Sequence, residues 1–480
     1  MINSKTKINL ILVFFCLLFA TFIRAYNIGY DDLWFDEISS FWVSDPEISF
    51  KESFIRHNNI EKTPFLYFAI LKINFELFSY NSVVGRGLSL FFNILGIIFS
   101  VLICKNLRNN SSYILSLFIF STNIFLINYS QELRVYSLVF FLTSLYLFLF
   151  ININKFYKNE FLNFPYFFFI SLVLLIMLLS HPFCLIVFFS TSLFILLEFI
   201  YKKKISKTLV YSSYFGIVVS LIIIFFIIID ADSAPTWIIQ PDIKFYTNFY
   251  FSKFFGSRLM GLIHLILLLS LIALIFKKTV KKIFELNIFL LIIFLSYFLP
   301  IVYGYIIAPV IFPRYIIFIL TPIIILLSIL IFDINNTFIR RVTISLVVVM
   351  NLGNLFFEAT FQQFYKTRPF FKPNFTEMIN VLKNDEVKLY TIELSSAKSN
   401  NNYYDDAIKN YISHFQIYKN SNIEYLEKKN FLNSNKDKIW VLCLINIDKD
   451  NCNKIKLNPN DNILSEKAIP GMRMALISKN

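Results

Sequence analysis

The chain has 480 residues, of which 57% are hydrophobic and 19% aromatic, and its mean hydropathy is +0.63. This composition excludes an ordinary water-soluble enzyme or binding module and predicts a polytopic membrane protein. The formal net charge is +14, but the basic residues stand in short clusters between apolar segments. That pattern orients helices in a bilayer and gives no reason to expect a nucleic-acid partner.

The first apolar segment follows Lys5 and Lys7 and reads "INLILVFFCLLFATFI". It resembles a signal sequence, but no small-residue cleavage site follows it. The segment is therefore predicted to be a retained signal anchor.

A transmembrane helix needs roughly 20 apolar residues, and we predict eleven such helices. The segments run over 8–25, 84–104, 111–129, 134–153, 162–180, 182–201, 208–229, 259–276, 285–307, 312–332 and 340–358. The shorter segment 64–79 carries Lys72 and Glu76 and is predicted to lie at the membrane interface.

The basic residues between the segments predict the topology. If the N-terminus is cytoplasmic, every basic loop also lies in the cytoplasm, as the positive-inside rule requires. These loops hold Lys105 and Arg108, Lys155 and Lys158, Lys202 to Lys204 with Lys207, Lys277 to Lys282, and Arg340 with Arg341. If 64–79 crossed the membrane completely, all of these basic loops would lie outside the cytoplasm. The loop 26–82 is therefore expected to be extracytoplasmic, together with the segments 129–136, 180–182, 230–258 and 313–315.

The composition changes after residue 358 to Asn, Lys, Asp and Ser. "EVKLYTIEL", "KIWVLCLINI" and "MRMALIS" are typical of strands, and "NFTEMINVLKN" and "DDAIKNYISHF" have helical spacing. We expect a transmembrane domain over 1–358 and a small extracytoplasmic α/β domain over 359–480. Cys443 and Cys452 either pair in an oxidising compartment or remain thiols.

Several short motifs together resemble the GT-C glycosyltransferases that use polyprenyl-phosphate sugars, such as protein O-mannosyltransferases and lipid A aminoarabinose transferases. The motifs are "LWFDE" (33–37), "EKTPFLYF" (61–68), "NSVVGRGLSLFFNILG" (81–96), "QELRVYSL" (131–138), "SHP" (180–182) and "PRY" (313–315). They cover the first two thirds of the chain. The resemblance implies a GT-C fold and an inverting transfer of one sugar.

The resemblance assigns the catalytic carboxylate to Asp36, the first residue of the Asp-Glu pair, with Glu37 supporting it or binding the acceptor. In such a transfer an acceptor loses a proton, positive charge develops at the anomeric carbon, and a phosphate departs. Partial desolvation at the lipid boundary would raise the proton affinity of Asp36. Asp31 and Asp32 have no counterpart in the family and are expected to be solvated loop residues.

Five cationic or imidazole side chains are candidates for the donor phosphate: Lys62, Arg86, Arg134, His181 and Arg314. The sequence "KTP" replaces the family's two prolines after the lysine. His181 is equally compatible with a buried histidine that a carbonyl satisfies, and single arginines or aromatics on this face are equally compatible with interface anchoring. The candidates for substrate binding are Glu61, Tyr67, Tyr136 and Tyr315, for which ordinary packing is the alternative.

Metal dependence is open at this stage. Glu132 is a candidate ligand for a divalent cation, although no ligand spacing demands one. "DAD" at 230–232 has the Asp-x-Asp form of nucleotide-sugar enzymes, but chance explains it better on an outer loop.

The sequence therefore predicts an integral membrane glycosyltransferase of a bacterial inner membrane. It would move a monosaccharide from a polyprenyl-phosphate carrier to an extracytoplasmic glycan, lipid or protein. One alternative is a polymerase or ligase that moves a lipid-linked oligosaccharide. The other is a non-enzymatic flippase or transporter, which would place ionisable residues near the bilayer midplane and often has repeated halves.

Overall fold

The computed structural model describes fourteen stretches of the chain. They are residues 4–61, 63–108, 111–156, 162–201, 205–229, 238–276, 286–358, 362, 364–367, 369–394, 403–414, 422–433, 435–444 and 462–479. The chain folds into two compact units. The first comprises Met1–Tyr26, Lys62–Tyr67 and Gly87–Thr367, and the second comprises Asn27–Glu61, Phe68–Arg86 and Arg368–Asn480.

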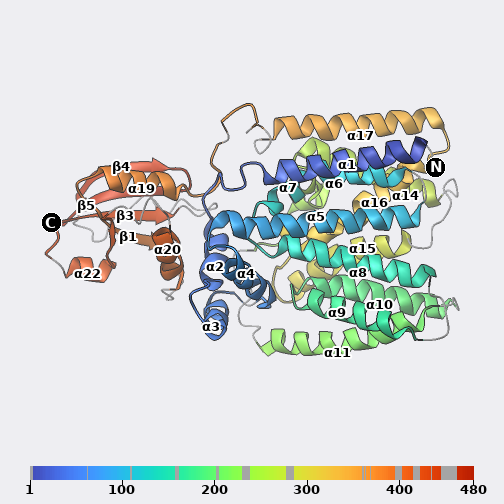
Figure 1. The fold of residues 1–480 in the computed structure, drawn as a ribbon, viewed down its shortest axis with the longest axis horizontal. Helices are drawn as coiled ribbons and strands as arrows, with labels where there is room; N and C mark the ends of the chain where they lie inside the picture. Colours follow the sequence, from blue (N-terminus) through green and yellow to red (C-terminus); the bar gives the residue numbers. More distant parts are fainter. Residues whose placement is uncertain are drawn as a thin grey trace. The chain divides into compact units, whose positions relative to one another are not determined.

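The first unit is a helical bundle. Its elements are α1 (Ser4–Ala25), most of α5 (Ser82–Leu107), α6 (Ser112–Thr122), α7 (Ile124–Ser130), α8 (Tyr136–Phe156), α9 (Phe164–Leu178), α10 (Cys184–Ile200), α11 (Lys207–Ile229), α12 (Ile243–Asn248), α13 (Phe251–Phe254), α14 (Arg258–Phe276), α15 (Leu286–Ile306), the 3₁₀ helix η2 (Pro313–Ile319), α16 (Leu320–Phe332) and α17 (Thr337–Phe357). Figure 1 shows the long helices α1, α8, α11 and α17 running in nearly the same direction.

Each of the eleven predicted apolar segments contains a helix. Among the described residues, seven helices are long and apolar enough to cross a bilayer, and the number is eight if the bent pair of α6 and α7 is counted as one span. The helices α9, α10 and α14 are apolar but shorter. The fold class is therefore confirmed, whereas the count of eleven spans is not. Helix α4 (Leu66–Leu77) has 12 residues, and its length of roughly 18 Å is too short for a bilayer core of about 30 Å.

The burial pattern of the bundle is that of a membrane protein. In α16 the residues from Leu320 to Ile331 are all buried. In α1, by contrast, Phe14 and Phe15 are 62% and 60% exposed. An apolar helix face of this kind is stable against lipid and costly against water.

The break between α6 and α7 bends the chain by 57°. Asn123 accepts a hydrogen bond from the Leu126 N–H (3.0 Å) and so caps α7. The guanidinium of Arg24, at the end of α1, donates to the carbonyls of Phe120 and Ser121, both at 3.0 Å. These carbonyls lie in the last turn of α6, where the helix itself supplies no donors. A buried arginine therefore satisfies the broken helix end.

The second unit combines helices of the outer loop with the C-terminal third of the chain. The helices are α2 (Phe35–Val43), α3 (Phe50–Ile60), most of α4, the first turn of α5, α19 (Phe375–Asn384), α20 (Tyr403–His414) and α22 (Lys428–Leu432). The strands are β1 (Leu389–Leu394), β2 (Glu424–Tyr425), β3 (Lys438–Leu444), β4 (Asn462–Ile469) and β5 (Met472–Ser478).

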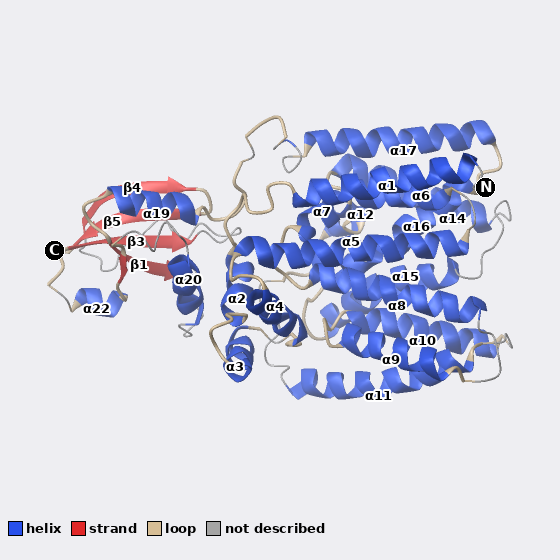
Figure 2. Ribbon diagram, in the orientation of Figure 1, coloured by secondary structure: helices blue, strands red, loops and turns tan. Residues whose placement is uncertain are grey.

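The strands form one mixed sheet in the order β2-β1-β3-β5-β4. The pairs β1·β2 and β1·β3 are parallel, and β3·β5 and β4·β5 are antiparallel. Figure 2 shows the sheet with α19 and α20 next to it. One face packs Ile439, Val441 and Ile477 against Phe431 of α22. The β4–β5 turn uses Gly471 at a φ of 72°, and the Pro470 carbonyl accepts from the Asn374 N–H just before α19.

The segments predicted as strands and helices after residue 358 contain β1, β3, β5, α19 and α20. The sequence analysis did not anticipate β2, β4 or α22. Cys443 is disulfide-bonded, and Cys452 lies outside the described residues. Cys16, Cys104 and Cys184 are free thiols.

Candidate active site

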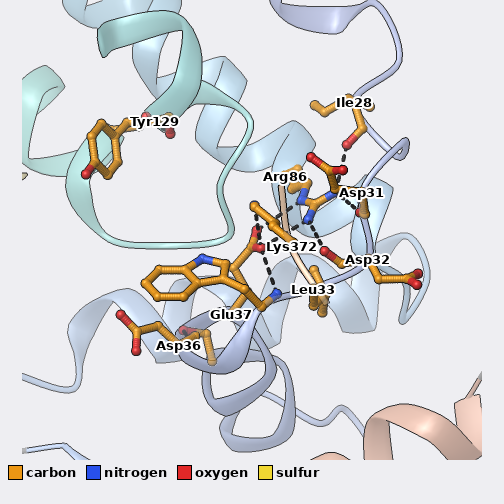
Figure 3. Close-up of polar contacts among 12 residues, drawn as sticks. Ile28, Asp31, Asp32, Leu33, Asp36, Glu37, Arg86, Tyr129 and Lys372 are labelled. Atoms are coloured by element: carbon orange, nitrogen blue, oxygen red, sulfur yellow. Dashed lines mark hydrogen bonds and ion pairs between the residues drawn. The ribbon is translucent and has the colours of Figure 1, made fainter. Parts of the chain in front are cut away.

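The Asp-Glu pair lies in the first turn of α2. Trp34 is the N-cap residue in an extended conformation, and its N–H donates to the Glu37 carboxylate (3.3 Å). Free N–H groups at a helix N-terminus favour negative charge at this point. Successive residues of a helix are rotated by about 100°, so the carboxylates of Asp36 and Glu37 point in different directions (Figure 3). Glu37 is fully buried, whereas Asp36 is half-buried.

Glu37 is bound by two cations (Figure 3). Arg86 donates through Nε to Oε1 and through Nη2 to Oε2, both at 3.0 Å. Lys372 Nζ donates to Oε2 at 2.7 Å. Burial raises the pKa of Glu37, but the charges of Arg86 and Lys372 and their hydrogen bonds outweigh it and lower the pKa to about 2. Glu37 is thus a buried carboxylate that is charged at neutral pH.

Arg86 also organises the backbone before α2. Its Nη1 donates to the carbonyls of Ile28 (3.0 Å) and Asp31 (2.7 Å), and its Nη2 donates to that of Asp32 (3.2 Å). With the two bonds to Glu37, all five N–H groups of the guanidinium have acceptors. Arg86 therefore holds the loop 28–37 in place.

Asp32 connects this loop to the C-terminal third of the chain. Its carboxylate accepts from the N–H (2.8 Å) and the hydroxyl (3.2 Å) of Thr376, in the first turn of α19, and from the Tyr411 hydroxyl (3.4 Å). Burial raises the pKa of Asp32, and these hydrogen bonds and Arg86 oppose the shift. Asp31 and Asp32 are only 4% and 9% exposed. The expectation that they are solvated was wrong, and for Asp32 the reason is that partners from far along the chain cover its carboxylate.

The other end of α2 also contacts the C-terminal third. The Asn410 amide donates to the carboxylate of Asp45 (3.3 Å). The Tyr80 hydroxyl lies 2.8 Å from the Phe41 carbonyl oxygen and 3.0 Å from the Asn410 side-chain oxygen. The rings of Phe41 and Tyr80 stack with centroids 3.8 Å apart. Both ends of α2 are therefore bonded to residues beyond 371.

In the first unit, four of the predicted site residues come together at helix ends. Arg314, in η2, lies 5.6 Å from the ring centroid of Tyr136 and 5.7 Å from that of Tyr315. His181, between α9 and α10, lies with its ring centroid 5.3 Å from Tyr315 and 6.3 Å from Tyr136. Phe312 adds a third ring, 5.0 Å from the guanidinium. Arg314 is 9% exposed.

The His181 ring is oriented by the backbone. Its Nδ1 lies 3.2 Å from the Phe183 N–H and accepts from it, which assigns the proton of the neutral imidazole to Nε2. Nε2 then carries the donor that an anionic ligand would need.

The other predicted residues are more scattered. Arg134 and Glu132 lie in the turn before α8, where the Arg134 N–H donates to the Glu132 carbonyl (2.9 Å). Glu61 ends α3, and Tyr67 is buried in α4. Lys62 and the "DAD" sequence lie outside the described residues.

No group of three or more His, Cys, Asp or Glu residues that suits a metal ion occurs within the described part of the chain. Glu132 is therefore not part of such a group among those residues.

Sequence reasoning missed Lys372, Thr376, Tyr411 and Asn410. Lys372 stands in "FFKPNF", which carries no recognisable motif, and its partner Glu37 is 335 positions away in the sequence. The only available signal was the excess of carboxylates in the loop 28–45, because buried acids require donors from elsewhere in the fold.

Comparisons with known proteins agree with the fold. No family model and no curated protein sequence matches the chain. The structure is similar to that of ArnT from Cupriavidus metallidurans. The apo form has a TM-score of 0.57 and 10% identity, over 99% of this chain and 98% of ArnT. The form bound to undecaprenyl phosphate has a TM-score of 0.55 and 11% identity, over 97% of each chain.

The Archaeoglobus fulgidus oligosaccharyltransferase, crystallised with Zn and sulfate, has a TM-score of 0.47 and 10% identity. The match covers 78% of this chain but only 55% of the oligosaccharyltransferase. The agreement with ArnT over nearly the whole of both chains shows that this membrane protein has a fold of the GT-C type, as the sequence resemblance implied.

Proposed function

We propose that the protein is a membrane glycosyltransferase that moves one sugar from a polyprenyl-phosphate carrier to an extracytoplasmic acceptor. The observation that carries the proposal is the different environment of the two adjacent carboxylates. Glu37 is buried and bound by Arg86, Lys372 and Trp34, whereas Asp36 points away from this group and keeps partial solvent exposure. The fold shared with a transferase that was crystallised with undecaprenyl phosphate supports the class of donor.

In this proposal Asp36 accepts the proton of the acceptor group or orients it. A carboxylate in the first helical turn is stabilised by the helix dipole, and a half-buried carboxylate can hydrogen-bond an acceptor group and take its proton in the transition state. The acceptor atom then bonds the anomeric carbon with inversion, while the bond from that carbon to the phosphate oxygen breaks and polyprenyl phosphate departs.

The departing phosphate is assigned to Arg314 and His181. Arg314 can hold two phosphate oxygens through parallel N–H donors, and the Nε2–H of His181 supplies a third. The rings of Tyr136, Phe312 and Tyr315 exclude water from the guanidinium, which strengthens its attraction for an anion. Lys62 and Arg134 remain proposed phosphate contacts, Glu61 and Tyr67 remain proposed substrate contacts, and Glu132 remains the proposed ligand if a metal is used.

For Arg86 and Glu37 the geometry supports a positioning role. All donors of Arg86 bind Glu37 or backbone carbonyls, so a direct phosphate contact would require this network to break. Their proposed task is to fix the turn that presents Asp36.

The proposed location is a bacterial inner membrane, with a transmembrane domain over 1–358 and an extracytoplasmic α/β domain over 359–480. The disulfide of Cys443 supports an outward C-terminal domain, because disulfides persist in oxidising compartments. The basic loops between the spans support the same orientation.

Mass spectrometry of envelope glycans and lipids tests the function. A deletion strain should lack one sugar modification, and wild-type protein, but not the Asp36→Asn variant, should restore it. The variant should still reach the membrane in normal amounts. Full restoration by Asp36→Asn would contradict the proposal, and a change in transport without any missing sugar would favour a transporter.

A further inference from the structure

We propose that the C-terminal segment fixes α2 at both ends, and that Lys372 is a positioning residue for the reaction in which Asp36 takes part. This inference rests on the proposed function and extends it to residues outside the first two thirds of the chain. It concerns contacts within the second unit only.

The N-terminal end of α2 is held by charge. Glu37 is fully buried, and Lys372 is its second cation, with a side chain only 15% exposed. Its Nζ donates to Oε2 (2.7 Å), an oxygen that also accepts from Arg86 Nη2. This additional charge-assisted hydrogen bond resists a rotation of the first turn of α2. Such a rotation would also move Asp36, which is the adjacent residue.

The preceding loop is held by neutral donors. Thr376 and Tyr411 bind the Asp32 carboxylate, and the Tyr411 oxygen accepts the Leu33 N–H at 3.0 Å. Tyr411 thus joins a side chain and the backbone of the loop that leads into α2. The start of the helix is therefore bonded to α19 and to α20.

The C-terminal end is held by Asn410, one residue before Tyr411. Asn410 bonds Asp45, just beyond α2, and lies against the Tyr80 hydroxyl. Contacts at two points along a helix prevent both tilting and axial rotation, whereas a contact at one end would leave tilting possible. The three carboxylates Asp32, Glu37 and Asp45 therefore serve to attach the C-terminal segment to the element that carries Asp36.

The test compares Lys372→Gln, Lys372→Arg and Lys409→Gln in the full-length protein. Lys409 is a matched control, because it also belongs to the C-terminal segment but bonds Asp406 (3.4 Å) and lies over the Tyr425 ring (4.1 Å). Hydrogen exchange of the α2 amides should be at least tenfold faster in Lys372→Gln than in wild type and unchanged in Lys409→Gln. Lys372→Arg keeps the charge and should restore slow exchange.

The product measured in the complemented deletion strain is the second readout. Per molecule of folded protein, Lys372→Gln should make at least tenfold less product, and Lys372→Arg should recover to within about threefold of wild type. If Lys372 acts through Glu37, the double variant Glu37→Gln/Lys372→Gln should lose no more than Glu37→Gln alone. A purely structural lysine would instead lower the amount of folded protein and leave the activity per molecule unchanged.

If Lys372→Gln fails to fold, Asn410→Ala provides a second test. It should accelerate hydrogen exchange of the amides at the C-terminal end of α2. If the α2 amides exchange at the wild-type rate in Asn410→Ala, or in a folded Lys372→Gln variant, the C-terminal segment does not fix α2. The proposed function of Asp36 would be unaffected by that result. If wild type and Asp36→Asn give the same amount of product, the proposed function fails. The hydrogen-exchange data then still decide whether the C-terminal segment fixes α2.

Discussion

At the scale of single residues, the centre of the account is the buried carboxylate of Glu37. Two cations neutralise it, and one of them, Arg86, also bonds three backbone carbonyls. The sequence alone indicated that Asp36 and Glu37 matter, because the pair resembles the family motif. It could not distinguish their environments, since these depend on Lys372, which is remote in the sequence, and on the direction of each side chain around the helix.

The first prediction concerns the stability that Glu37 provides. Glu37→Gln leaves Arg86 and Lys372 without their anion and should lower the free energy of unfolding by about 3–5 kcal/mol. The control is Glu52→Gln, which removes an exposed partner of Arg56 (3.4 Å) on α3 and should cost less than about 1 kcal/mol. Denaturant unfolding in detergent measures both variants, and equal losses would contradict the structural role of Glu37.

The second prediction concerns pH. The pKa of Glu37 is about 2 in the folded protein, below the value of about 4.3 for an exposed glutamate. The unfolded chain therefore binds the proton more readily, and the stabilisation by Glu37 is complete above about pH 4.5 and is lost as the pH falls toward 2. Wild type should lose more stability than Glu37→Gln between pH 6 and pH 3. The pKa of Asp32 is raised instead, so Asp32 lowers the stability of the folded protein as the pH rises. This effect is present both in wild type and in Glu37→Gln. If the stability of wild type and of Glu37→Gln changes with pH in parallel, the lowered pKa of Glu37 is refuted.

At the scale of elements, hydropathy was a reliable guide to the helices of the bundle. Each predicted apolar segment contains a helix because backbone groups in a bilayer must be bonded within their own segment. Hydropathy did not indicate the break at Asn123, which depends on Arg24, Asn123 and the Phe254 carbonyl. The sequence also did not indicate the strands β2 and β4. Glu424 and Tyr425 form only a short edge strand, and β4 is mostly exposed, so neither carries an apolar signal.

The third prediction concerns the helix break. Arg24→Leu removes the donors of the Phe120 and Ser121 carbonyls and leaves buried acceptors unsatisfied, at a cost of about 1–3 kcal/mol each. Arg24→Lys keeps the charge but cannot reproduce the planar fork. The thermal midpoint should fall most in Arg24→Leu and by an intermediate amount in Arg24→Lys. An unchanged midpoint in Arg24→Leu would show that the α6 end is satisfied in another way.

At the scale of the whole molecule, the sequence divides at residue 358, but the compact units do not follow that boundary. The second unit also takes in Asn27–Glu61 and Phe68–Arg86. Composition marks where polar sequence begins, whereas the unit is defined by the packing of segments that are far apart along the chain, such as Asn27–Glu61 and Arg368–Asn480. No local pattern carries that information.

The fourth prediction concerns the compartment of the C-terminal third. Cys443 is disulfide-bonded, so its peptide should resist maleimide in denatured, unreduced protein and react after reduction, whereas the free thiols Cys16, Cys104 and Cys184 should react in both. Alkaline phosphatase fused after residue 480 should be active, because it folds only outside the cytoplasm. A reactive Cys443 together with an inactive fusion would place this part inside and contradict the topology.

The release of polyprenyl phosphate from native lipid tests the central claim most directly, because it does not require the sugar to be known. Purified wild-type protein is reconstituted with a lipid extract from the source cells and an envelope fraction as acceptor, and polyprenyl phosphate is measured by mass spectrometry beside the Asp36→Asn and Arg314→Gln variants. The account predicts release by wild type, at least a hundredfold less by Asp36→Asn, and weakened release by Arg314→Gln that higher donor concentration partly restores. Equal release by wild type and Asp36→Asn would contradict it.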